Sequence, residues 1–123
     1  MSKISQHFAR SEFACHCGDC PESRDPTVDV TLIAILEELR RHFDTPITVT
    51  SGVRCKSFNF KNGGRPFSKH LEGKAADVLL KGVTPDRVYD YLVDRYPGYG
   101  FGKYATFTHI DSRSLKARWE VKG

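Results

Sequence analysis

The run Ala75–Leu80 is apolar except for one carboxylate, that of Asp77. Its length and residue types are typical of a buried strand. Burying a carboxylate costs free energy unless a partner neutralises it, so the fold must bring a partner to Asp77. Gly73 permits a sharp turn that returns His70 towards Asp77, and the strand begins with small side chains that leave room for close approach. A metal ion shared by His70 and Asp77 would satisfy this requirement.

A second pair of candidate ligands lies in the segment 106–111, whose sequence is TFTHID. Side chains alternate along a strand, so His109 and Asp111 are expected on one face. His70, Asp77 and His109 together offer two imidazoles and one carboxylate, which would leave the fourth position of a zinc ion open, as in catalytic zinc sites. The alternative for each residue taken alone is a structural role, such as a hydrogen-bonded core histidine.

The periodicity of the rest of the chain predicts the fold class. Apolar residues at helical spacing predict an amphipathic helix over 28–43, and Thr84 followed by Pro85 predicts a second helix that runs to about residue 96. Strands are expected at 47–51, 75–80, 99–103 and 106–111, with a long loop over 52–69. These elements indicate an α+β fold with a small, mostly antiparallel sheet packed against helices.

Length and charge exclude several classes of protein. The 123 residues fit one domain, in which we expect a cysteine-rich N-terminal segment (1–27), a core (28–113) and a basic tail (114–123). The net charge of +4 is too small to indicate a nucleic-acid partner, and no apolar run approaches the ~20 residues of a membrane span. The first residues lack the apolar stretch of a secretion signal, so we expect synthesis in the cytoplasm. We also expect the protein to be a monomer.

The chain contains four cysteines, which is the unusual feature of its composition. Three lie within the segment 15–20 (CHCGDC), and the whole set is Cys15, Cys17, Cys20 and Cys55. Four thiolates can hold a second, structural zinc ion. The other interpretations are disulfides, for example one that ties the N-terminal segment to Cys55, and reduced, half-buried thiols. His16 lies inside the cluster and is a weaker additional ligand candidate.

Several short motifs follow one another in order along most of the chain. They are SGVR at 51–54, Asn59, Gly63-Gly64, SxHxxGxAAD at 68–77, GYGxxKY at 98–104 and FTHIDxR at 107–113. Over about residues 5–113 the chain closely resembles the zinc D-Ala-D-Ala carboxypeptidases and the related murein endopeptidases, whose fold is shared with the hedgehog signalling domain. The opening QHFARSEFAC also resembles a small, single-domain, often phage-linked branch of that family.

The resemblance implies roles for individual residues. It makes His70, Asp77 and His109 the zinc ligands and gives Arg54 the place of a substrate-binding arginine. The planar guanidinium of Arg54 suits a peptide carboxylate or a developing oxyanion, so we expect it to bind substrate and assist catalysis. The alternative for Arg54 is a surface salt bridge. Ser68 is expected to hydrogen-bond a ligand residue or the substrate.

The chain departs from the family at one position. Several relatives carry a catalytic glutamate three residues before the last histidine, where this chain has Thr106. Asp111 is therefore our candidate for the general base, because it lies two residues from His109 on the same face. The competing role for Asp111 is to accept a proton from His109 and fix the orientation of that ring. Glu72, on the turn after His70, is a third candidate base.

The resemblance predicts a zinc peptidase that hydrolyses stem or cross-link peptides of peptidoglycan. It would act at the cell wall or in the periplasm, and a phage or prophage lysis system would explain how it arrives there. One alternative is an inactive zinc-bearing module that binds cell-wall peptides. Another is a small cysteine–zinc binder of nucleic acid around residues 15–20, which the acidic segment 21–29 disfavours.

Overall fold

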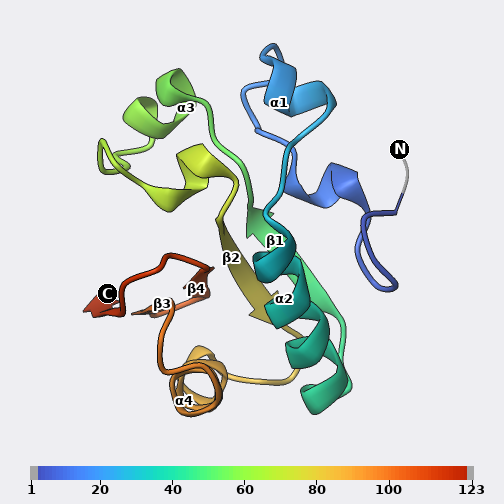
Figure 1. Cartoon of the computed structure of the whole chain (residues 1–123), viewed down its shortest axis with the longest axis vertical. Coiled ribbons are helices and arrows are strands. Elements are labelled where there is room, and N and C mark those ends of the chain that lie inside the picture. Colours follow the sequence, from blue (N-terminus) through green and yellow to red (C-terminus); the bar gives the residue numbers. More distant parts are fainter. Residues whose placement is uncertain (1–2, 122–123) are drawn as a thin grey trace.

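A five-stranded mixed sheet forms the centre of the computed structural model, which describes residues 3–121 (Figure 1). The strands are β1 (Ile47–Ser51), β2 (Ala75–Leu80), β3 (Gly100–Tyr104), β4 (Thr108–Asp111) and β5 (Ala117–Val121), in the spatial order β1-β2-β4-β3-β5. Neighbouring strands are antiparallel except β3 and β5, which are parallel. The predicted α+β fold with a mostly antiparallel sheet is confirmed.

Two longer helices pack on the sheet. The helix α2 (Val30–Phe43) begins where the carboxylate of Asp29 accepts a hydrogen bond from the Leu32 amide, and α4 (Pro85–Arg95) begins at the hydroxyl of Thr84. In Figure 1, α2 lies across β1 and β2, and α4 lies at the end of the sheet opposite α1 (Pro21–Arg24) and α3 (Lys56–Lys61). Among residues 3–121, no helix has the length and apolar character needed to cross a bilayer.

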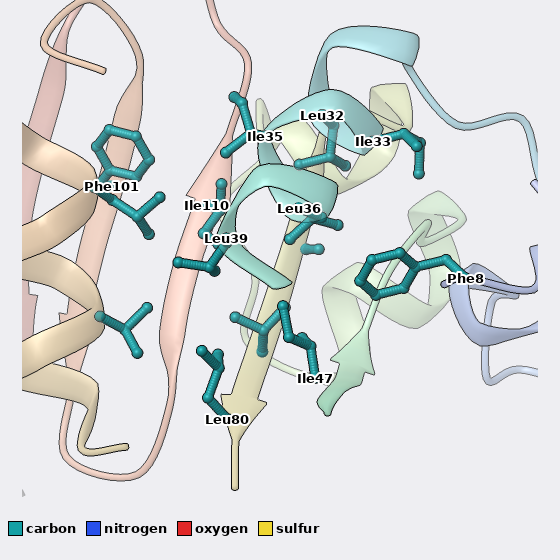
Figure 2. Packing of buried hydrophobic residues seen from close by; sticks show 14 of the residues in the cluster. Phe8, Leu32, Ile33, Ile35, Leu36, Leu39, Ile47, Leu80, Phe101 and Ile110 are labelled. Carbon is teal, nitrogen blue, oxygen red and sulfur yellow. The ribbon is translucent and has the colours of Figure 1, made fainter. Parts of the chain in front are cut away.

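The hydrophobic core lies between α2 and the sheet. Figure 2 shows Leu36 and Leu39 of α2 in one cluster with Leu80 and Ile110 of the strands, and Phe8 enters it from the N-terminal segment. Each fully buried side chain of this kind contributes about 1.5–3 kcal/mol. Because Phe8 is 1% exposed, the N-terminal segment packs into the same core as the sheet.

Three elements lie where the sequence predicts none. The segment 52–69, expected as one long loop, contains α3, and the 3-10 turn η2 (Lys69–Glu72) begins at its last residue. The expected basic tail contains β5, which pairs with β3. All three elements are short, and the alternation of apolar and charged residues in β5 extends over five positions, so local periodicity is a weak signal for each of them. The N-terminal segment contains η1 (Arg10–Phe13) and α1, and positions 1, 2, 122 and 123 lie outside the described residues.

Candidate metal centre

Three side chains from three different elements converge at one point. His70 lies on η2, Asp77 on β2 and His109 on β4, and all three are buried. The Oδ1 atom of Asp77 is 3.0 Å from Nδ1 of His109 and 3.3 Å from Nε2 of His70. One potential ligand atom from each residue lies within 4.8 Å of the other two. The structure thus brings together the three residues that the sequence predicts as a ligand set.

The pairing of the strands brings two of these three side chains together. Ser51, Asp77, His109, Gly102 and Trp119 are successive cross-strand partners, and we call them the transverse row. Directly paired residues project from the same face of a sheet, so Asp77 and His109 are neighbours by backbone pairing alone. Only His70 has to be brought in from outside the sheet.

The turn that carries His70 is held at both ends. The hydroxyl of Ser68 accepts a hydrogen bond from the His70 amide at 3.2 Å. Gly73 ends the turn with φ of +70°, and a Cβ there would lie 2.1 Å from the carbonyl oxygen of Thr27. A side chain at position 73 would therefore displace the turn and His70 with it.

The second nitrogen of each imidazole has its own partner. Nδ1 of His70 donates to the carbonyl of Gly52 at 2.7 Å, and Nε2 of His109 donates to Oδ2 of Asp111 at 2.8 Å. Metal-ligating histidines almost always have such a partner, which fixes the tautomer and aims the other nitrogen at the ion. The donor atoms that remain, Nε2 of His70, Nδ1 of His109 and Oδ1 of Asp77, are the kinds of ligand that zinc prefers, so the residues present fit that ion.

Asp111 is enclosed by the protein. The residue is 0% exposed, and its Oδ1 accepts from the amide and Nε of Arg113, at 3.2 and 2.8 Å. Its Oδ2 accepts from Nη2 of Arg113 at 2.7 Å and from His109. Gly100 makes room for this pair, since a Cβ at that position would lie 2.3 Å from Oδ1 of Asp111. This geometry suits the orienting role considered for Asp111 and leaves its carboxylate no open side for proton transfer.

Electrostatics in the cluster follow from burial and hydrogen bonding. Burial raises the pKa of Asp77, but hydrogen bonds from His109 and His70 outweigh it and hold that pKa well below its usual range. Asp111 behaves likewise, with hydrogen bonds from His109 and Arg113 lowering its pKa against the effect of burial. Burial lowers the pKa of His109, and hydrogen bonds to the two carboxylates raise it above its ordinary value. Both carboxylates are therefore ionised at neutral pH.

Arg54 borders the centre. Its side chain is 17% exposed, and Nη2 lies 3.3 Å from Oδ2 of Asp77. Nε donates to the hydroxyl of Ser51 at 3.0 Å, and Nη1 donates to Oδ1 of Asn59 at 3.3 Å. A guanidinium has five N–H donors, so these contacts fix the group and leave part of its donor set for another molecule. Arg54 is thus half-buried beside Asp77 and is not a surface salt bridge.

Trp119 is a site residue that the sequence analysis missed. Its ring centroid lies 4.9 Å from that of His109, and its Nε1 donates to the hydroxyl of Tyr104 at 3.1 Å. The indole reaches His109 by passing over Gly102, where a Cβ would lie 2.4 Å from Nε1. Trp119 is the one tryptophan of the chain, and the alternation of apolar and charged residues over 117–121 was the available signal.

The remaining predicted residues lie at the margins. Glu72 pairs with Nζ of Lys69 at 3.0 Å and Nζ of Lys74 at 3.8 Å, and its side chain is 45% exposed. Gly64 lies against Asn59, where a Cβ would clash with the amide side chain. Away from this centre, the four cysteines are unpaired with one another, and their sulfur atoms all lie within 4.8 Å of each other.

Comparison with protein families identifies the family of the chain. A protein-family model described as Peptidase M15 matches residues 6–111, which is most of the chain. The matched range contains His70, Asp77, His109 and Arg54, and it stops before β5 and Trp119. No curated protein matches the chain.

Proposed function

The chain belongs to the peptidase M15 family, and on that premise we propose that it is a zinc peptidase that hydrolyses stem or cross-link peptides of peptidoglycan, as a carboxypeptidase or an endopeptidase. The observation that carries the proposal is the convergence of His70, Asp77 and His109 on one point, with ligand atoms within 4.8 Å of one another. The second nitrogen of each ring is hydrogen-bonded, that of His70 to Gly52 and that of His109 to Asp111, and these contacts orient the rings as the partners of metal-ligating histidines do.

His70, Asp77 and His109 would hold the zinc ion, with one position left open. Zinc in such a site supplies a Lewis acid and a nucleophilic water at neutral pH. The chain's own contribution is to keep the three ligand atoms in place without side-chain motion, because Asp77 and His109 are fixed by strand pairing and His70 by the turn 68–73. A preformed site of this kind costs little reorganisation during the reaction.

Arg54 would bind the substrate. The contacts of its Nε, Nη1 and Nη2 with Ser51, Asn59 and Asp77 hold the guanidinium plane beside the ligand cluster. Its free N–H groups can then donate to a peptide carboxylate or to the oxygen that becomes negative as the carbonyl is attacked. Because Arg54 also pairs with the ligand Asp77, substrate binding and ligand orientation depend on the same side chain.

Asp111 would orient His109 and not act as the base. A general base has to reach the proton that it removes, and Asp111 is 0% exposed with Arg113 on both of its oxygens. Among the carboxylates considered from the sequence, Glu72 is the accessible one, and it lies on the same turn as His70. We therefore keep Glu72, which lies at the margin of the site in contact with Lys69 and Lys74, as the candidate for proton transfer that the Glu72→Gln variant tests.

Digestion of purified peptidoglycan, followed by mass spectrometry of the products, tests the proposal. The zinc-loaded protein should release defined peptides, and the mass of each product identifies the bond cut. A chelator and the His70→Ala variant should each abolish release, while His42→Gln, a change at an exposed histidine on α2, should leave it intact. An unchanged digest from zinc-loaded wild-type protein would refute the peptidase assignment.

An inactive binding module is the second candidate. The enclosed carboxylate of Asp111 favours it, because Thr106 also stands where several relatives have a catalytic glutamate. The module would retain muropeptides on a zinc-loaded column and release no products from them. Glu72→Gln separates the candidates further, since it should lower product release by about 10²-fold or more in an enzyme and leave retention by a module unchanged.

We propose that the protein acts at the cell wall or in the periplasm, since that is where its substrate lies. A monomer is sufficient for this activity, because all of the residues assigned above come from one chain. Size-exclusion chromatography with light scattering tests the monomer.

A further inference from the structure

The four cysteines form one group beside the starts of α1 and α3, since Cys20 and Cys55 directly precede these helices. Figure 1 shows both helices at the same end of the molecule. Cys15, Cys17 and Cys20 come from the segment before α1, and Cys55 immediately precedes α3. The sulfur atoms are not bonded to one another, and every pair of them lies within 4.8 Å. Two disulfides would require two close pairs, whereas four sulfurs around one centre is the arrangement of a tetrahedral metal site.

The distances suit zinc. Four thiolates at about 2.3 Å from a zinc ion stand about 3.8 Å from one another, within the spread seen here. Four sulfur ligands close the coordination sphere, which is typical of a structural site and unlike the open position of the histidine centre. Cys15 is 3% exposed and the other three are half-buried, so the site would lie just beneath the surface.

The sulfur atoms have hydrogen-bonding neighbours of the kind that surround metal ligands. The Ser23 hydroxyl donates to the Cys15 carbonyl at 2.8 Å and lies 3.4 and 3.5 Å from the sulfurs of Cys17 and Cys20. It also accepts from the amide of Gly18, whose φ of +84° forms the turn between Cys17 and Cys20. Outer partners of this kind orient ligands and are part of the affinity for the ion.

We propose that Cys15, Cys17, Cys20 and Cys55 bind a structural zinc ion that fixes the segment 52–55 beside the histidine centre. Each residue of that segment has a partner. Gly52 accepts from Nδ1 of His70, and the amide of Val53 donates to the carbonyl of Phe13 at 2.9 Å. The amide of Arg54 donates to the carbonyl of His70 at 3.0 Å, and the amide of Cys55 donates to the sulfur of Cys15 at 3.4 Å.

The chain therefore connects the two centres through consecutive residues. Ordering Cys55 also orders Arg54 and the carbonyl that aims His70. The site is independent of the proposed function: a protein that holds zinc on its thiolates but leaves peptidoglycan intact would refute the peptidase and keep this assignment.

Metal content and thiol reactivity of the full chain, purified under reducing conditions with zinc, test the proposal. The wild type should contain about two zinc ions, one for each centre, and the His70→Ala/His109→Ala variant about one. In that variant the thiols should resist a thiol reagent until a chelator is added. Cobalt in place of the zinc should show thiolate-to-cobalt charge-transfer absorption.

The cysteine variant tests the link between the centres. Cys17→Ser/Cys20→Ser should keep about one zinc, and that ion should bind about tenfold more weakly than in the wild type. Lys56→Gln changes an exposed residue next to Cys55 and should keep both ions at wild-type affinity. If the cysteine variant fails to fold, the histidine variant still decides the question, because thiol protection and thiolate-to-cobalt absorption in that variant report ions on the cysteines. Iron in place of zinc, disulfides seen by mass, or four thiols that react freely in the presence of zinc would each overturn the assignment.

Discussion

Replacing Asp111 with asparagine separates the two roles considered for this residue. The change keeps the size of the side chain and one oxygen acceptor but replaces the other oxygen with an NH2 group, which donates hydrogen bonds. Oδ1 accepts from the amide and Nε of Arg113, and Oδ2 accepts from Nη2 of Arg113 and from His109. Whichever oxygen is lost, at least one hydrogen bond to Arg113 loses its acceptor, and the negative charge disappears from a fully buried position.

The loss of these contacts sets the expected decrease in the free energy of unfolding. A hydrogen bond to a charged group contributes about 1.5–3 kcal/mol, and Arg113 keeps some access to water, so we expect Asp111→Asn to lower the free energy of unfolding by about 2–4 kcal/mol. His109 also loses the carboxylate that fixes its tautomer. Loss of such a partner typically weakens metal binding about 10–100-fold, so zinc affinity should fall by that factor.

Three measurements check the reasoning: urea unfolding of the metal-free protein, zinc competition with a chromophoric chelator, and peptide release at saturating zinc. Saturating zinc should restore activity to within about tenfold of the wild type, because an orienting residue acts through affinity. Asp94→Asn, an exposed change on α4, is the matched control and should alter none of the three. Unchanged zinc affinity together with a loss of activity of about 10²–10⁴-fold would make Asp111 the base and refute the orienting role.

Three further predictions follow from the same centre. Gly102→Ala places a Cβ 2.4 Å from Nε1 of Trp119, so it should cost about 1–3 kcal/mol in urea unfolding and shift the fluorescence of the one tryptophan; an unchanged spectrum would contradict the close packing. The metal-free protein should be most stable between about pH 4 and 6.5, as urea unfolding across pH would show. The depressed pKa of Asp77 adds stability that is lost as pH falls below its unfolded value, and the raised pKa of His109 adds stability that is lost as pH rises through it. Arg54→Lys removes the planar fork but keeps a positive charge beside Asp77, so kcat/KM should fall about tenfold or more while the zinc content at saturating zinc stays the same; unchanged kinetics would exclude substrate contact.

Much of the centre was predictable because its chemistry is local in the sequence. Asp77 stands out as the one carboxylate in an apolar strand, and Gly73 marks the turn that returns His70 to it. His109 stands out because it shares a strand with Asp111. The antiparallel pairing of β2 with β4 brings His109 beside Asp77, and the turn at 68–73 brings His70 to them.

The rest depends on contacts between distant parts of the chain. Trp119 reaches His109 only because β5 pairs with β3 in parallel and Gly102 has no side chain, and neither condition is visible in local periodicity. The role of Asp111 depends on its contacts with Arg113, because these contacts decide whether the carboxylate is exposed to solvent. Spacing along a strand predicts which face a residue occupies, but not how much solvent reaches it.

Zinc binding at the transverse row requires the correct pairing of the strands. A slip of one residue between β2 and β4 would turn His109 to the opposite face from Asp77, because successive side chains alternate. Such a misregistered sheet would lose the ion altogether and not merely bind it less well. Since an ion that binds only the correct register stabilises that register by mass action, zinc would select properly paired chains from mispaired ones during folding.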